Sequence, residues 1–264
     1  MTKVTVVSAL FDIDRVDGRK WDQYLKWFKQ TLQLKVPMIL FIPKDLQEIV
    51  DEVRGDLETQ TIYQEVDDIP YYNLKKEIED IIDSEEYHDK MSDSSRIECR
   101  QAMHPIINFS KFDWLKQAAN MNHHKSDAFL WLDAGASRFF DGFEVDTQWP
   151  SEDALESLGG MEDGFLVQMN CDYYPDLYGA EELGLDYLWD NRSYVLGSLF
   201  GGSNKAVNKV ADQVDDILRN KMIGDNNINN EQIALGYLVK KYPDDYVIYN
   251  RTNGKHMDLF GELS

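Results

Sequence analysis

The sequence has 264 residues, 43% of them hydrophobic and 12% aromatic, so the chain is long and apolar enough to fold around a sizeable core. With 27 Lys and Arg against 48 Asp and Glu, its net charge is −21, which disfavours nucleic acid or an anionic membrane as a partner. The acidity otherwise agrees with plain solubility or adaptation to salt, and an anionic small ligand would need a local cation.

The cysteine content and the lengths of the apolar segments indicate the cellular compartment of the protein. Only Cys99 and Cys171 are present, far apart and without CxxC spacing, which excludes a disulfide scaffold and a cysteine-rich zinc site. No apolar run reaches the roughly 18–20 residues of a membrane span. The N-terminus lacks the apolar length and cleavage site of a signal peptide. We therefore predict a cytoplasmic protein with no membrane span.

The first 66 residues alternate short β-branched runs with amphipathic patterns. Val4–Leu10 predicts a buried strand, and apolar residues at three- and four-residue spacing then predict a helix. The residues of that helix face are Trp21, Tyr24, Leu25, Phe28 and Leu32. Further strands are predicted over Pro37–Ile42 and Thr61–Val66, with a helix over Asp45–Val53 between them. This order favours an α/β fold with an open, mostly parallel sheet flanked by helices.

The pattern continues after one charged interruption. Residues 67–100 are the most charged and least patterned, and we expect a helix and a mobile loop on the surface there. The later elements are a helix over 112–119, strands over Phe129–Leu132, Phe165–Met169 and Tyr194–Phe200, helices from an N-cap at Ser203 to Leu218 and over Asn229–Tyr242, and a strand over Tyr246–Tyr249.

Asp133 follows directly on the most apolar of these strands, in AFLWLDAGASRFF. In open α/β sheets, ligands bind beyond the carboxyl ends of the strands, and Gly135 permits a sharp turn or the close approach of a ligand. A carboxylate at this position can hold a divalent metal that bridges to a diphosphate. The alternative is an aspartate that closes a turn by hydrogen bonds to its own backbone.

The end of the first strand, SALFDIDR, is a second candidate. Its small residues and two acids suit a loop that accepts a base or ribose, with Arg15 able to bind phosphate bidentately. The alternative is a surface turn in which the arginine pairs with a neighbouring acid.

Three further stretches carry weaker signals. The glycines of GSLFGGS precede a helix, so their N–H groups can face an anion or a sugar hydroxyl, although a tight strand-to-helix turn explains them equally well. Glu231, in NNEQ, is either a general base or sugar ligand, or simply a stabiliser of the helix dipole. His256 can return to a metal held by Asp133 with Lys255 near phosphate, or lie exposed. No G-x-S-x-G elbow or Ser-His-Asp order supports a hydrolase.

Taken together, several of these segments resemble the HtrL/YibB family of bacterial and viral proteins, which look like nucleotide-sugar glycosyltransferases of the GT-A fold. The matching segments, in chain order, are VTVVSALFDIDR with YLKWF, PMILFIP, NFSKFDWLKQAA, FLWLDAGASRFF, GSLFGGS and NNEQIALGYLVKKYPDDY. The resemblance covers most of the chain, and FLWLDAG is its most specific part. It implies a single GT-A-like domain over 1–264, with a nucleotide-binding half over 1–135 and an acceptor-side half over 136–264.

The resemblance also implies roles for individual residues. The nucleotide would lie against Ser8, Ala9, Phe11, Asp12 and Arg15, with Lys111 reaching its ribose or diphosphate. Asp133 and Gly135 stand where GT-A enzymes carry the Asp-x-Asp metal motif. Gly201, Gly202 and Glu231 would face the sugar and the acceptor.

The sequence departs from the pattern of GT-A enzymes at two positions that affect the expected mechanism. Gly135 replaces the second Asp of Asp-x-Asp, and Asn230 stands where an acid often precedes the glutamate, so metal dependence and the identity of the base both stay open. The implied reaction transfers a sugar from a UDP- or GDP-sugar to a glycan or other hydroxyl acceptor. Mn²⁺ or Mg²⁺, or Lys and Arg charge, would stabilise the departing diphosphate. Glu231 or Asp133 would serve as the catalytic carboxylate, and an inverting reaction would need such a base.

Two other functions fit the same motifs. FLWLDAG also resembles a methyltransferase glycine motif that binds S-adenosylmethionine, but it lies halfway along the chain and Ser137 replaces its second glycine. A non-catalytic nucleotide-sugar or glycan binder would keep the fold and lose one metal ligand.

Overall fold

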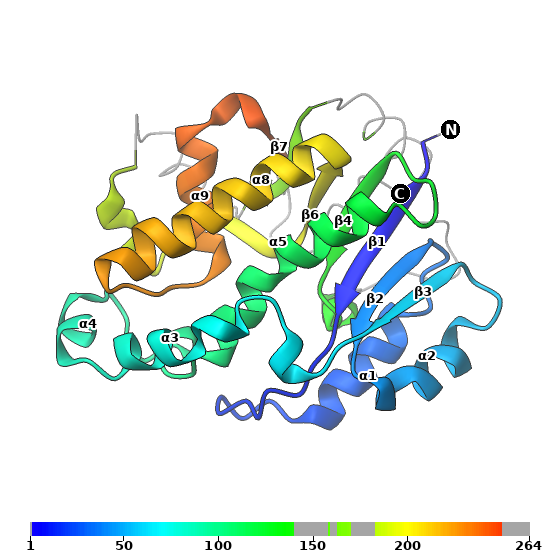
Figure 1. Cartoon of the computed structure of the whole chain (residues 1–264), viewed down its shortest axis with the longest axis horizontal. Coiled ribbons are helices and arrows are strands. Elements are labelled where there is room, and N and C mark those ends of the chain that lie inside the picture. The colour runs from blue at the N-terminus through cyan, green and yellow to red at the C-terminus, as the bar shows by residue number, and fades with distance from the viewer. Residues whose placement is uncertain (1, 140–157, 159–162, 170–182, 250–264) are drawn as a thin grey trace.

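A single seven-stranded sheet organises the computed structural model, which describes residues 2–139, 158, 163–169 and 183–249 (Figure 1). The strands are β1 (Val4–Ala9), β2 (Met38–Ile42), β3 (Thr59–Tyr63), β4 (Ala128–Leu132), β5 (Phe165–Met169), β6 (Val195–Ser203) and β7 (Tyr246–Tyr249). Their order across the sheet is β3-β2-β1-β4-β6-β5-β7. All neighbours pair in parallel except β6, which is antiparallel to β4 and to β5. The predicted α/β class with a mostly parallel sheet is confirmed.

Helices cover both faces of the sheet, as expected when parallel strands are buried on both sides. The helices are α1 (Trp21–Thr31), α2 (Gln47–Arg54), α3 (Lys75–Ile82), α4 (Glu85–Lys90), α5 (Met103–Met121), α8 (Asn204–Asp216) and α9 (Glu231–Lys241). Successive strand residues point to opposite faces, so Val6 packs in the core under α1 and α2, whereas Val7 packs in the core under α3, α5, α8 and α9.

Local sequence signals account for the helix ends. Ser203 caps α8, its Oγ accepting a hydrogen bond from the N–H of Ala206 at 3.2 Å, as predicted. Asn230 caps α9 in the same way, with its side-chain oxygen 3.2 Å from the nitrogen of Ile233. None of the helices in the described part of the chain is both long and apolar enough to cross a bilayer.

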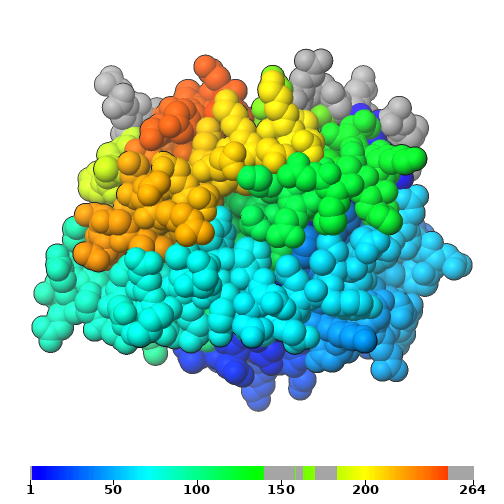
Figure 2. All heavy atoms as spheres, viewed as in Figure 1, coloured from blue at the N-terminus to red at the C-terminus, as the bar shows by residue number. Residues whose placement is uncertain are grey.

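The helix expected within residues 67–100 is present as α3, but the expectation that the segment lies on the surface is wrong. Ile78, Ile82 and Tyr87 are buried in the main core, and the Tyr87 hydroxyl donates to the carbonyl of Ile228 at 2.8 Å. In Figure 2 this segment, in cyan, forms a continuous band against α5 and the gold segment after α8. The many charged residues lie on the outer side of short amphipathic helices. Each helix has so few buried apolar residues that the sequence shows no clear helical periodicity.

Candidate functional site

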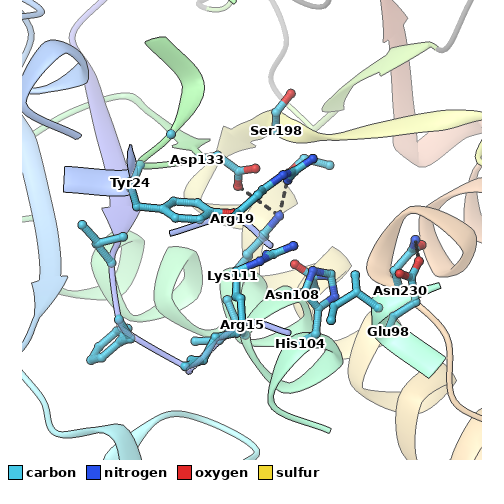
Figure 3. A pocket seen from close by; sticks show the side chains of 18 of the residues that line it. Arg15, Arg19, Tyr24, Glu98, His104, Asn108, Lys111, Asp133, Ser198 and Asn230 are labelled. Atoms are coloured by element: carbon cyan, nitrogen blue, oxygen red, sulfur yellow. Dashed lines mark hydrogen bonds and ion pairs between the residues drawn. The ribbon is translucent and has the colours of Figure 1, made fainter. Parts of the chain in front are cut away.

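A cavity of about 830 Å³ opens at the carboxyl ends of β1 and β4 (Figure 3). Its walls come from the segment after β1, the first half of α5, the turn after β4, and the beginnings of β6 and α9. Because β6 runs antiparallel to β4, its first residues reach this edge while its last residues lie at the opposite one. The cavity is therefore at the position where ligands bind in open α/β sheets, and residues from both predicted halves of the chain line it.

Asp133 lies at the end of β4 with its side chain facing the cavity. The turn is closed by backbone groups, since the N–H of Ala136 donates to the Asp133 carbonyl at 2.8 Å. This leaves the carboxylate available, and its Oδ1 accepts a hydrogen bond from Trp131 Nε1 at 2.8 Å and lies 3.0 Å from Lys111 Nζ. The side chain is 25% exposed. The carboxylate is thus held in place by fixed donors but still open to a ligand.

Lys111, from the middle of α5, is buried between two carboxylates. Its ammonium lies 3.0 Å from Asp133 Oδ1 and donates to Glu231 Oε1 at 2.7 Å and to the Gly197 carbonyl at 3.0 Å. Burial alone would lower the pKa of Lys111, but the two carboxylates outweigh it and raise that pKa. All three ammonium protons have partners within the protein. Lys111 lines the cavity, and its implied contact with ribose or diphosphate stays a prediction that would require the ammonium to exchange one of these partners.

Glu231 is the first residue of α9, and its side chain is 1% exposed. Burial raises the pKa of this carboxyl, against the opposing effect of Lys111, and its Oε2 has no hydrogen-bond partner among the residues that the structure describes. A Cβ at Gly197 would lie 2.0 Å from Glu231 Oε1, so only glycine leaves room for the carboxylate there. Glu231 borders the cavity but points its charge at Lys111, which makes Asp133 the better placed of the two predicted catalytic carboxylates.

The end of β1 and the segment that follows it supply most of the predicted nucleotide residues. Ala9, Phe11, Asp12 and Arg15 all line the cavity, and the Phe11 ring stacks on Trp114 with centroids 5.5 Å apart. Ser8 does not reach it, because its buried hydroxyl donates to the Leu132 carbonyl at 2.6 Å and ties β1 to β4.

Arg15 faces the cavity and also forms a local ion pair. Its guanidinium donates to both carboxylate oxygens of Asp17, the shorter distance being 2.5 Å. This hydrogen bonding lowers the pKa of Asp17 to about 2. The structure shows the salt bridge that was one of the two alternatives for this arginine, and bidentate phosphate binding stays a prediction.

Gly201 and Gly202 are not brought to the cavity. Both lie inside β6, where Gly201 pairs with Leu130 of β4 and Gly202 with Phe129. A Cβ at Gly201 would come within 2.0 Å of the Phe129 carbonyl oxygen, so this glycine serves the close approach of two backbones. The predicted glycine cradle before α8 is thus a strand.

We expect Gly201→Ala to lower the free energy of unfolding by about 1–3 kcal/mol, because the methyl group would push β6 away from β4. Urea unfolding followed by circular dichroism measures this change. Gly224→Ala is a matched control, since its nearest neighbour would lie at an ordinary 3.5 Å. Equal stability of the two variants would contradict this role for Gly201.

The described residues do not fit a resident divalent metal. Asp133 Oδ1 already faces an ammonium and an indole N–H, and Gly135 offers no second carboxylate. No group of three His, Cys, Asp or Glu side chains suited to a metal occurs within the described ranges. His256, the other predicted ligand, lies outside the described residues.

The sequence analysis did not identify Arg138, an arginine that lines the cavity. Arg138, five residues after Asp133, lies 5.5 Å from the centroid of the Trp27 ring and 4.6 Å from that of Phe139. Within the described part of the chain its guanidinium makes no ion pair or hydrogen bond. A Cβ on Gly135 would lie 3.2 Å from Arg138 Nη1, so this arginine occupies the space beside the missing second aspartate. Arg138 follows the same strand as Asp133, and this position in the sequence could have identified it as a residue of the site.

Other cavity residues were missed although they repeat at helical spacing. His104 and Asn108 precede Lys111 by seven and three residues, so the same face of α5 carries all three into the cavity (Figure 3). Arg19 and Glu98 come from segments in which no motif was identified, and Tyr24 was predicted only as part of an amphipathic helix face.

Comparison with known proteins gives the family. The model of the HtrL_YibB family, described as a bacterial protein of unknown function, matches residues 2–263. The chain belongs to this family. No curated protein matches the HtrL/YibB sequence. Among solved structures, the crystal structure of 4-diphosphocytidyl-2C-methyl-D-erythritol synthase from Anaerococcus prevotii DSM 20548 is similar over 98% of this chain and 94% of that one, with 10% identity and a TM-score of 0.40.

Proposed function

We propose that this HtrL/YibB protein is a glycosyltransferase that moves a sugar from a nucleoside-diphosphate donor, UDP- or GDP-linked, to a hydroxyl acceptor. The observation that carries the proposal is that Asp133 and Arg138 line the same cavity, and that the Arg138 guanidinium has no ion pair with any residue that the structure describes. A carboxylate that can accept a proton from a hydroxyl and a cation that can bind a diphosphate thus lie five residues apart in the sequence.

The charge distribution supports an anionic donor. In a chain of net charge −21, four of the nine arginines, Arg15, Arg19, Arg96 and Arg138, line the described walls of this cavity. With Lys20 and Lys111, these arginines equal in number the six Asp and Glu side chains of the same walls, so the cavity is close to neutral in an otherwise acidic chain. Arginine binds phosphate oxygens bidentately, and near-neutral walls repel an anionic donor less than the rest of the surface does. Phe11 and Tyr24 border the same region and offer aromatic surface to a base.

The reaction that we propose is a displacement at the anomeric carbon. The acceptor oxygen forms a new bond to that carbon while the bond from the carbon to the diphosphate oxygen breaks with its electron pair. The acceptor proton passes to Asp133, and Arg138 with Arg15 and Arg19 stabilises the charge that develops on the departing diphosphate. Lys111 keeps Asp133 oriented and Glu231 keeps Lys111 in place.

Calorimetric titration with UDP, GDP, ADP and CDP, each with EDTA and with Mn²⁺, tests the donor half of the proposal. We expect one nucleotide to bind and the matching nucleotide sugar to release nucleoside diphosphate slowly by hydrolysis. Absence of binding by all four nucleotides would reject a glycosyltransferase. Binding of S-adenosylhomocysteine instead would indicate a methyltransferase, and donor binding without hydrolysis or transfer would indicate a binder.

Arg138→Ala is expected to weaken nucleoside diphosphate binding about 10- to 100-fold, because hydrogen bonds between charged groups contribute roughly 1.5–3 kcal/mol each. Calorimetry on the nucleotide identified above measures the change. Arg219→Ala, which removes an exposed arginine paired with Asp215 outside the cavity, is the control and should leave the affinity unchanged. Equal affinities of the two variants would remove Arg138 from the donor site.

A further inference from the structure

The cavity contains a second polar region that the donor does not need. Glu98, His104, Asn108, Asn230 and Gln232 line it, coming from the turn before α5, the first half of α5 and the start of α9. In Figure 3 Glu98 and Asn230 lie together on the side away from Tyr24, with His104 and Asn108 between them and the arginines. We call these five residues the amide lobe. Lys111 connects the two regions, since it pairs with Asp133 on one side and with Glu231, the neighbour of Asn230, on the other.

The amide lobe carries no uncompensated charge. The Glu98 carboxylate is 6% exposed and its Oε1 receives both the guanidinium of Arg96 and the Asn230 amide, the latter at 2.7 Å. Burial, with a smaller effect from the charges of Arg15 and Lys111, lowers the pKa of His104 to about 3, so its imidazole is neutral at physiological pH. The nearby cations are committed to acids of the protein, Arg96 to Glu98, Arg15 to Asp17 and Lys111 to Asp133 and Glu231. A charged ligand would therefore find no free counterion here and would lose its hydration.

The lobe instead offers neutral donors and acceptors. The Asn108 amide lies 3.2 Å from His104 Nδ1 and donates to it, which places the imidazole proton on Nε2. Within the described residues, His104 Nε2, Asn108 Oδ1 and the amide of Gln232 have no hydrogen-bond partner, although all three residues line the cavity. Ile107 and Leu196 supply apolar surface beside them. An alternation of donor, acceptor and apolar surface suits a ligand whose hydroxyls both donate and accept and whose ring carbons are apolar.

We propose that the amide lobe binds the acceptor and selects an uncharged sugar, with the Asn108–His104 pair and Gln232 holding its hydroxyls. This inference rests on the proposed function, because it places the attacking hydroxyl between the lobe and Asp133. Acidic and amino sugars are disfavoured because the charged groups around the lobe are already paired with one another. The lobe therefore determines acceptor specificity, whereas the arginines hold the donor.

Saturation-transfer NMR, with the protein saturated by the nucleoside diphosphate that it binds, tests the proposal. The probes are methyl glycosides of glucose, galactose and N-acetylglucosamine, compared with those of glucuronic acid and glucosamine. We expect at least one neutral glycoside to bind, and to bind about tenfold more tightly than its charged counterparts. Preference for a charged glycoside, or binding of none of the five, would overturn the assignment.

Asn108→Leu and, independently, Gln232→Leu should each weaken the bound glycoside by about tenfold, the usual effect of one lost hydrogen bond with its partner left unpaired. Asn120→Leu, on the same helix but outside the cavity, is the control and should change nothing. Melting temperatures identify a variant that fails to fold, and the second variant then decides. If the wild type binds nucleotide but both variants bind the glycoside as tightly as the wild type, the amide lobe is not the acceptor site. The proposed donor site is not affected by that result. If no nucleotide binds, the proposed function itself fails.

Discussion

Lys111→Met is expected to lower the free energy of unfolding by about 3–5 kcal/mol, the usual cost of leaving buried charge without its partner. The Lys111 side chain is 7% exposed, and its ammonium lies between Asp133 and Glu231, whose side chain is 1% exposed. Methionine fills a similar volume, so the effect reports the lost charge rather than a cavity. Urea unfolding of the variant at pH 7, analysed with the same slope as the wild type, measures it.

A second substitution shows whether the cost is electrostatic. In Lys111→Met with Glu231→Gln, the buried carboxylate is neutral, so we expect the double variant to recover more than half of the lost stability. Lys116→Met is the matched control, because this lysine on the same helix pairs at the surface with Asp212, which is 72% exposed. If Lys111→Met is as stable as Lys116→Met, the buried ion pairs do not hold this site together.

Asp133→Asn is expected to lower the rate of sugar transfer, or of donor hydrolysis, by at least about 100-fold, the contribution typical of a positioned general base. An asparagine oxygen can still accept from Trp131 and Lys111, so the fold should survive and the melting temperature should change little. Detection of released nucleoside diphosphate measures the rate. Asp113→Asn, which changes a carboxylate on α5 that bonds only Gln117 among the described residues, is the control.

The possible results for Asp133→Asn distinguish a catalytic role of the aspartate from a structural one. Loss of folding in Asp133→Asn would make the aspartate a structural turn residue, and retention of wild-type activity would remove it from the mechanism. If Mn²⁺ stabilises the wild type with bound nucleotide and Asp133→Asn abolishes that effect, the carboxylate holds a cation delivered with the nucleotide.

Several elements follow from local sequence because local interactions fix them. The period of Trp21, Tyr24 and Phe28 gave α1, and the hydroxyl of Ser203 marked the start of α8. The strands Phe165–Met169 and Tyr246–Tyr249 were bounded correctly to the residue. Residues 67–100 were misjudged because their core contacts come from distant elements, as in the bond from Tyr87 to Ile228.

The sequence by itself determined the fold class and the position of Asp133, since an apolar strand that ends in Asp-Ala-Gly identifies its own carboxyl end. Only the tertiary structure decided which residues join it. Strand direction is set by pairing between distant segments, and the antiparallel β6 brings Gly197 and Ser198 to the site in place of Gly201 and Gly202. The same long-range packing commits Lys111 to two carboxylates 22 and 120 residues away, which no local pattern encodes.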